Sequence, residues 1–177
     1  RQAAPLSANQ VGALTTSAEA GLTPADIVAL TSTQISGLTG AQVGALSSSQ
    51  FGALSPAQIS ALTSAGIGGL TTAEVSSMST AQIGGLTSAQ VGALTLTQLG
   101  ALSPTQIGAV KTSALAGLTT AEVAALSTLQ LGGLSSMQVG ALTLPQVGAL
   151  SSGQIGSLTS AAVVGFTTDE IAALTTV

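Results

Sequence analysis

An aliphatic or aromatic residue recurs every eight positions along this chain, without a single insertion or deletion. The series starts at Leu6 and ends at Leu174, and its only members other than leucine are Met78, Val110 and Phe166. Self-similarity at a fixed period is typical of solenoids and arrays, in which each repeat packs only against its neighbours. We therefore treat residues 1–177 as one repeat array.

Each eight-residue repeat, or octad, carries the signature of a helix start. The residue after the leucine is Ser or Thr in 20 of the 21 complete octads. The fourth residue after the leucine is Gln, Glu or Asp in 17 of them. This S/T-x-x-Q/E spacing is that of the capping box. Pro24, Pro56 and Pro104 each follow a cap directly, at the first helical position, where proline is favoured. Because a cap residue is not helical, each octad predicts about seven helical residues followed by a bend.

The pattern predicts an all-α solenoid, a spiral of very short helices with one helix per octad. The two large apolar residues of an octad lie three apart, so they share one face of a helix but would face opposite sides of a strand. A β-solenoid is the alternative, since its corners can bury both positions, although Ala, Gln and Pro are poor strand residues. The predicted core includes Leu30, Ile35, Leu54, Ile59, Leu94, Leu102, Ile107, Leu142 and Val147.

A second period spans six octads. The four octads that lack the polar residue carry instead Ala18, Gly66, Ala114 and Ala162, and the octads after them carry Asp26, Glu74, Glu122 and Glu170. Each series repeats every 48 residues, which gives units of about 15–62, 63–110 and 111–158 and a partial unit, 159–177. One explanation of this period is duplication of a 48-residue block without selection on its length. A geometric explanation is that 48 residues complete a whole number of turns, two turns at three octads each or one turn of six.

The acids of the 48-residue series are predicted to be structural caps. Their expected partners are the cap hydroxyls of the same octads, which pairs Thr23 with Asp26, Thr71 with Glu74, Thr119 with Glu122 and Thr167 with Glu170. Binding of Ca²⁺ is the alternative, but it needs six to eight oxygen ligands. The sequence brings two carboxylates together only at Asp169 and Glu170.

Two charged residues depart from the pattern. Lys111 replaces a cap residue, and we expect it to be a solvated surface residue. Glu19 stands where an aliphatic residue is expected. It marks either an irregularity near the start of the array or a helix shifted by one residue, because Thr16 and Glu19 also have the spacing of a capping box.

Composition argues against catalysis and against a nucleic-acid partner. The chain has no His or Cys, so the commonest general base and the strongest nucleophile are missing. We predict no catalytic residue, no cofactor and no metal. Two basic residues and a net charge of −4 give no basic surface for nucleic acid. No stretch of about 18 residues is free of Ser, Thr or Gln, so we expect no membrane span.

The octads "TTAEVAAL", "TSAQVGAL" and "SPAQISAL" resemble the L-T/S-x-x-Q-V/I-x-A tracts of very large, low-complexity repeat proteins that bacteria export to the cell surface. The resemblance covers the whole chain. It implies an extracellular or cell-surface location and a role as an adhesin, matrix or filament protein.

Two functions follow as hypotheses. Isolated helices this short are unstable in water, and a surface with few charges promotes association. The first hypothesis is therefore a structural protein that assembles with itself into an extracellular filament, sheath or stalk. The alternative is a surface-binding or adhesion module, whose regular Thr and Ser ranks meet ice, a polysaccharide or a mineral. A surface polysaccharide is then a candidate partner.

Overall fold

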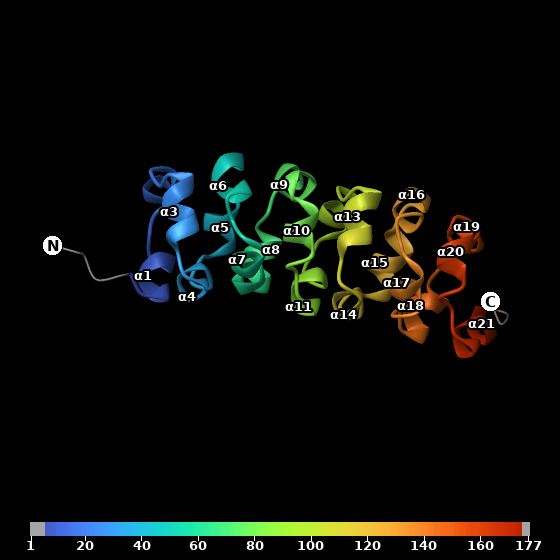
Figure 1. Ribbon diagram of the computed structural model, residues 1–177. Helices are drawn as coiled ribbons and strands as arrows, with labels where there is room; N and C mark the ends of the chain where they lie inside the picture. The colour runs from blue at the N-terminus through green and yellow to red at the C-terminus, as the bar shows by residue number, and fades with distance from the viewer. Residues whose placement is uncertain (1–5, 175–177) are drawn as a thin grey trace.

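The computed structural model describes residues 6–174, and its secondary structure in that range is entirely helical. Within residues 6–174, twenty-one helices of four to seven residues follow one another, one per octad. They form an elongated spiral whose two ends lie far apart (Figure 1). The predicted all-α solenoid is thus confirmed.

Each helix packs against the helix three places further along the chain, so three octads complete one turn. The helices therefore stack in three columns that run along the spiral. The first column holds α1 (Ala8–Gly12), α4 (Ser32–Ile35), α7 (Pro56–Ala61), α10 (Thr80–Ile83), α13 (Pro104–Ala109), α16 (Thr128–Leu131) and α19 (Ser152–Gly156). The second holds α2 (Thr16–Ala20), α5 (Gly40–Val43), α8 (Ser64–Gly68), α11 (Ser88–Val91), α14 (Thr112–Leu115), α17 (Ser136–Val139) and α20 (Ser160–Val163). The third holds α3 (Pro24–Ala29), α6 (Ser48–Gly52), α9 (Thr72–Ser77), α12 (Leu96–Gly100), α15 (Thr120–Ala125), α18 (Leu144–Gly148) and α21 (Thr168–Leu174).

Most helices are shorter than the seven residues that the octad predicts. The chain leaves the helix because the next leucine N–H bonds only three residues back, as in Leu38 to the Ile35 carbonyl (3.1 Å). The following Ser or Thr is extended, for example Thr39 with φ −81° and ψ 163°. A tight last turn and an extended cap together make the corner of the spiral.

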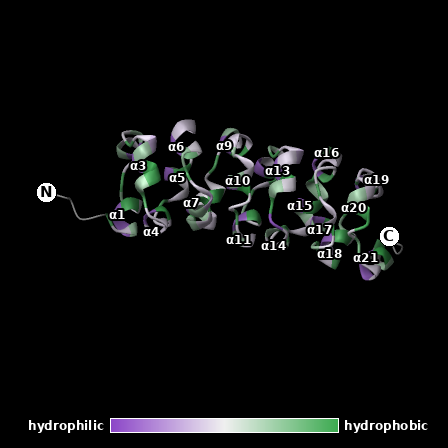
Figure 2. Ribbon diagram, viewed as in Figure 1, coloured by the Kyte–Doolittle hydropathy of each residue, from purple (hydrophilic) through white to green (hydrophobic). Residues whose placement is uncertain are grey.

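The core is a single strip of aliphatic side chains along the spiral axis. It is filled by the two large apolar residues of each octad, and Figure 2 shows the hydrophobic segments distributed along the whole length of the spiral. Of the predicted core residues, Leu30 is only partly buried, since no described helix precedes α3 in its column. The others are buried: Ile35, Leu54, Ile59, Leu94, Leu102, Ile107, Leu142 and Val147.

Small residues let neighbouring turns approach closely in the second column. A side chain on Gly92 would clash with the Gly117 carbonyl, and one on Gly117 would clash with the Ser88 carbonyl. No described glycine has a positive φ, so these positions need glycine for space rather than for backbone freedom. Gly100 in the third column has no such neighbour within 4 Å, and its small size is not required there.

Candidate functional site

The four predicted cap pairs all lie in the third column, at the starts of α3, α9, α15 and α21. In each pair the acid accepts from the cap backbone N–H, at 2.8 Å for Asp26, 2.7 Å for Glu74, 2.6 Å for Glu122 and 2.6 Å for Glu170. The cap hydroxyl accepts in return from the backbone N–H of the acid, at distances of 3.2 to 3.3 Å for Thr23, Thr71, Thr119 and Thr167.

The glutamines of the repeat do more than cap their own helix. Gln98 shows the arrangement: its Oε1 accepts from the Thr95 backbone N–H (2.8 Å), while its Nε2 donates to the carbonyls of Ile67 (3.1 Å) and Leu70 (2.6 Å). The Ile67 carbonyl lies in the last turn of helix α8 and the Leu70 carbonyl in the corner after it, both in the preceding turn of the spiral. One amide therefore satisfies a helix start and a helix end that are far apart in the sequence. We call this arrangement a glutamine joint.

Eleven described glutamines form this joint. Each donates to the carbonyls 31 and 28 residues earlier, at distances of 2.6 to 3.2 Å. These sequence separations follow from the three octads in each turn. The start of each helix then lies over the end of the helix four places earlier in the chain and over the corner after it. All eleven side chains are buried: Gln42, Gln50, Gln58, Gln82, Gln90, Gln98, Gln106, Gln130, Gln138, Gln146 and Gln154.

The 48-residue period of the sequence reflects which octads carry glutamine at the joint position. Every octad of the first column carries glutamine at the joint position. The second column alternates glutamine with Ala or Gly, and the third alternates glutamine with an acid. Because six octads make two turns, each column returns to the same residue after 48 positions. The geometric explanation of the period, with three octads per turn, therefore agrees with the fold.

At the acid positions the joint loses its donor. Glu74 uses Oε2 for the cap, and its Oε1 is buried without any hydrogen-bond partner. The carbonyls 31 and 28 residues before it belong to Val43 and Leu46, and no side chain of the described residues donates to either. A carboxylate cannot supply the two N–H groups that glutamine offers. We call this arrangement an acid joint.

Asp26 differs from the other acids because it is exposed. Its carboxylate accepts from the Thr23 hydroxyl (2.6 Å) and from the Thr23 backbone N–H (2.8 Å). These two bonds, the hydroxyl first, lower the pKa of Asp26 below its usual value. Its surroundings are those of a helix-capping acid.

Glu19 occupies its octad in register, because helix α2 starts after Thr15, whose hydroxyl accepts from the Ala18 N–H (3.2 Å). The interpretation of a helix shifted by one residue is therefore wrong. The side chain points inward, with 2% of its surface exposed, and neither carboxylate oxygen has a partner. Burial raises the pKa of Glu19 to about 7.

Lys111 is exposed and makes no side-chain cap, as we expected.

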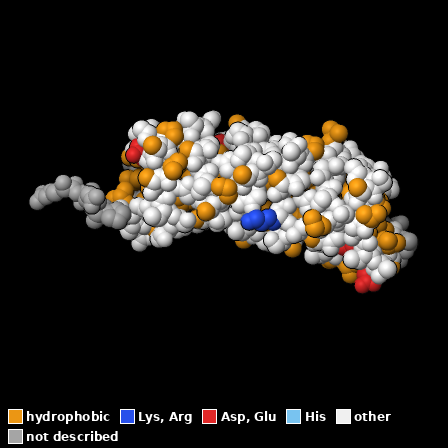
Figure 3. All heavy atoms as spheres, in the orientation of Figure 1, with side chains coloured by type: hydrophobic (Ala, Val, Ile, Leu, Met, Phe, Trp, Pro, Cys, Tyr) orange, Lys and Arg blue, Asp and Glu red, His pale blue; other side chains and the backbone are white. Residues whose placement is uncertain are grey.

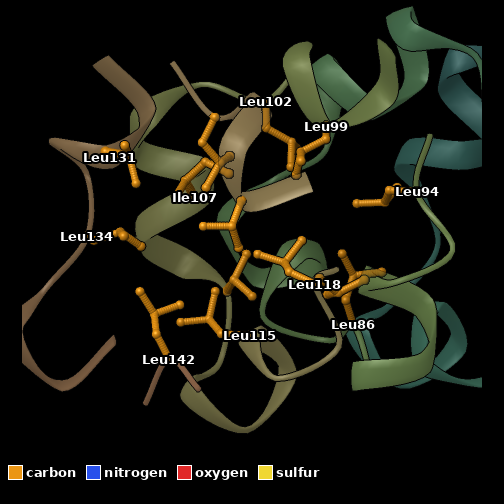
Figure 4. A pocket seen from close by; sticks show the side chains of 14 residues that line it. Leu86, Leu94, Leu99, Leu102, Ile107, Leu115, Leu118, Leu131, Leu134 and Leu142 are labelled. Carbon is orange, nitrogen blue, oxygen red and sulfur yellow. The ribbon is translucent and has the colours of Figure 1, made fainter. Parts of the chain in front are cut away.

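An apolar gap in the middle of the spiral is too small for a ligand. Figure 4 shows this gap, which lies between turns and whose lining includes Leu99, Leu102, Leu118 and Leu131. Its volume is about 10 Å³, about the space of one water. Within residues 6–174 no group of three or more acidic, His or Cys side chains could hold a metal ion, and no helix is long and apolar enough to cross a membrane.

Sequence reasoning identified the capping half of each glutamine but missed the other half. The donation from Nε2 to the previous turn depends on the number of octads per turn, which the sequence did not fix. One signal was available: a cap alone accepts Glu as readily as Gln, yet 13 octads carry Gln and only three carry Glu. That preference indicates a need for the amide donor.

Comparison with known protein families identifies the repeat. A family model described as the ALTTAQ repeat matches six overlapping segments, at residues 20–56, 48–79, 67–96, 107–144, 115–152 and 145–176. A search of curated proteins found no match. The six letters of the family name correspond to the small residue before the leucine through to the joint position, as in "GLTSAQ" at residues 85–90. Because the matches cover well over half of its length, this chain belongs to the ALTTAQ repeat family.

Proposed function

We propose that this chain is a structural repeat protein that assembles with itself into an extracellular filament, sheath or stalk. The observation that carries the proposal is the two-turn length of the 48-residue unit. Equivalent positions of successive units lie on the same column, so a surface feature that the units share offers a regular series of contact points along the spiral. Such a series suits lateral association along the length of an elongated molecule.

Two of the exposed aliphatic side chains are separated by this two-turn spacing. Leu96 at the start of α12 and Leu144 at the start of α18 occupy equivalent positions of the third column, with 54% and 49% of their surfaces exposed. The face in Figure 3 shows scattered hydrophobic side chains among uncharged atoms and few charged groups. Low charge removes the repulsion that keeps surfaces apart. We infer that Leu96 and Leu144 contribute to the contact between copies.

Sedimentation velocity over a range of protein concentrations, with electron microscopy of the same samples, tests the proposal. We expect the unmodified chain to form rods or sheets, and the double variant Leu96→Ser with Leu144→Ser to shift toward monomer. Leu129→Ser is the matched control, because Leu129 is 76% exposed but lies on the first column. A monomer at every concentration, or equal effects of all substitutions, would contradict the proposed contact.

The extracellular location rests on the resemblance to exported bacterial repeat tracts. The proposal includes no catalytic activity, since the chain lacks His and Cys. Antibody labelling of intact cells that express the native protein tests the location. Labelling only after the cells are permeabilised would contradict it.

A row of Ser and Thr hydroxyl groups along the second column supports the alternative function, a surface-binding module. In the second column the residue after the cap is Ser or Thr in six of seven helices, and these hydroxyls are free of the capping role: Thr16, Ser64, Ser88, Thr112, Ser136 and Ser160. Regular hydroxyl spacing suits ice, a polysaccharide or a mineral. Thermal hysteresis and polysaccharide pull-down, each repeated with Ser88→Lys plus Thr112→Lys, distinguish this function from self-assembly.

A further inference from the structure

The buried carboxyl of Glu19 has no role in the architecture described above. It stands in the aliphatic slot of α2, where the next three 48-residue units carry Ile67, Leu115 and Val163. The side chain is almost fully buried, and neither carboxylate oxygen has a hydrogen-bond partner among the described residues. A buried ionised carboxylate without partners is strongly unfavourable.

Within residues 6–174, no group near Glu19 compensates the charge of its ionised carboxylate. Helix α2 packs against α5 and lies between α1 and α3 in the chain, and the only titratable side chain on these three helices is Asp26 on α3. Asp26 is itself acidic, exposed and bonded to Thr23. The amide of Gln50 on α6 donates to the backbone carbonyl of Glu19, not to its carboxylate. Helix α6 carries no titratable residue.

We propose that Glu19 is a pH-sensitive lock, which keeps α2 packed against α5 while its carboxyl carries a proton and releases α2 when the carboxyl ionises. The proton is exchanged with solvent as α2 opens. Release exposes the carboxylate to water and uncovers the part of the aliphatic core that α2 covers. Opening of α2 breaks the Gln50 joint, whose amide donates to the Glu19 and Leu22 carbonyls. The joints further along the spiral remain, because part of a protein can open without global unfolding.

The sign and size of the effect follow from linkage. Burial raises the pKa of Glu19 from 4.5 to about 7, so the closed form retains a proton that the open form loses between these values. The ratio of closed to open α2 therefore falls about tenfold per pH unit from pH 4.5 to about 7 and levels off above that. Across the whole interval the fall is roughly 300-fold.

Hydrogen exchange of the full chain, read by mass spectrometry and corrected for the intrinsic pH dependence of exchange, tests the lock. We expect protection of α2 to fall as pH rises from 5 to 8.5, while protection of α8, the equivalent helix one unit later, stays constant. Glu19→Ile restores the aliphatic residue found at Ile67 and should protect α2 equally at both pH values. Glu19→Gln keeps a polar side chain without the titration and should also abolish the pH dependence.

Asp26→Asn is the matched control, since it removes a neighbouring carboxylate that is exposed. That variant should keep the full pH dependence of α2. The proposal is overturned if α2 protection in the unmodified chain does not change with pH. It is also overturned if protection in Glu19→Ile and Glu19→Gln changes with pH as much as in the unmodified chain.

Discussion

The Gln98 joint and the Glu74 joint lie in the same column, in adjacent turns, and differ mainly in one functional group. Both side chains cap their own helices through an oxygen, at 2.8 Å and 2.7 Å from the cap N–H. Gln98 then donates to Ile67 and Leu70 in the turn below, whereas Glu74 leaves a buried oxygen without a partner. The comparison separates the capping role, which either residue can perform, from the role of holding two turns together, which needs the amide.

The largest expected effect comes from converting a glutamine joint into an acid joint. Gln98→Glu keeps the cap but places a carboxylate oxygen beside two carbonyls, and we expect a loss of about 3 kcal/mol in the free energy of unfolding. Urea denaturation followed by far-ultraviolet circular dichroism measures it. Gln98→Met, of similar size but without a donor or a charge, should lose less. Equal stability of Gln98→Glu and the unmodified chain would show that the amide contacts do not hold the turns.

The reverse change should stabilise the protein. Glu74→Gln supplies the missing donor for the Val43 and Leu46 carbonyls, and we expect a gain of about 1–2 kcal/mol, or roughly 1 kcal/mol per new hydrogen bond. The same denaturation experiment applies, with Asp169→Asn as the control because Asp169 is an exposed carboxylate. No gain would mean that acid joints are not deficient.

Removing the cap hydroxyls should have a smaller effect at both joints. Thr95→Ala removes one accepted bond and a 3.1 Å contact to the Gln98 oxygen, and a cap of this kind contributes about 1 kcal/mol. Thr71→Ala also removes a charge-assisted bond of 2.7 Å to Glu74, so it should cost a few tenths of a kcal/mol more. A thermal melt of each variant in parallel detects the difference. A larger loss of stability in Thr95→Ala than in Thr71→Ala would argue against a stronger cap at the acid joint.

The smallest expected effect tests whether the third column depends on side-chain joints rather than on close backbone contact. Gly100→Ala adds a methyl group in open space on the helix that carries Gln98, and we expect a gain of about 0.5–1 kcal/mol from helix propensity. Gly92→Ala in the second column is the contrasting variant and should destabilise, because it meets the Gly117 carbonyl. A loss of stability in Gly100→Ala would indicate a contact there that the fold does not contain.

Local features of the fold could be predicted from the sequence, because capping and apolar spacing act within one octad. Thr71 and Glu74, for example, lie three residues apart, and their mutual bonds do not depend on the rest of the chain. Features that join distant octads could not be predicted. The bond from Gln98 to Ile67 spans 31 residues and requires three octads per turn, which depends on the angle at each corner. The burial of Glu19 could not be predicted either, because a carboxyl at an aliphatic position also fitted a helix shifted by one residue.

Exchange of the side-chain amide protons of Gln98, followed by nuclear magnetic resonance, tests most directly whether glutamine holds the turns together. Gln10 is the internal reference, because it caps α1 from an exposed position and its Nε2 has no bond to any described residue. Bonded to the Ile67 and Leu70 carbonyls, both protons of Gln98 should exchange at least tenfold more slowly than those of Gln10. Exchange of both glutamines at the same rate would contradict the account.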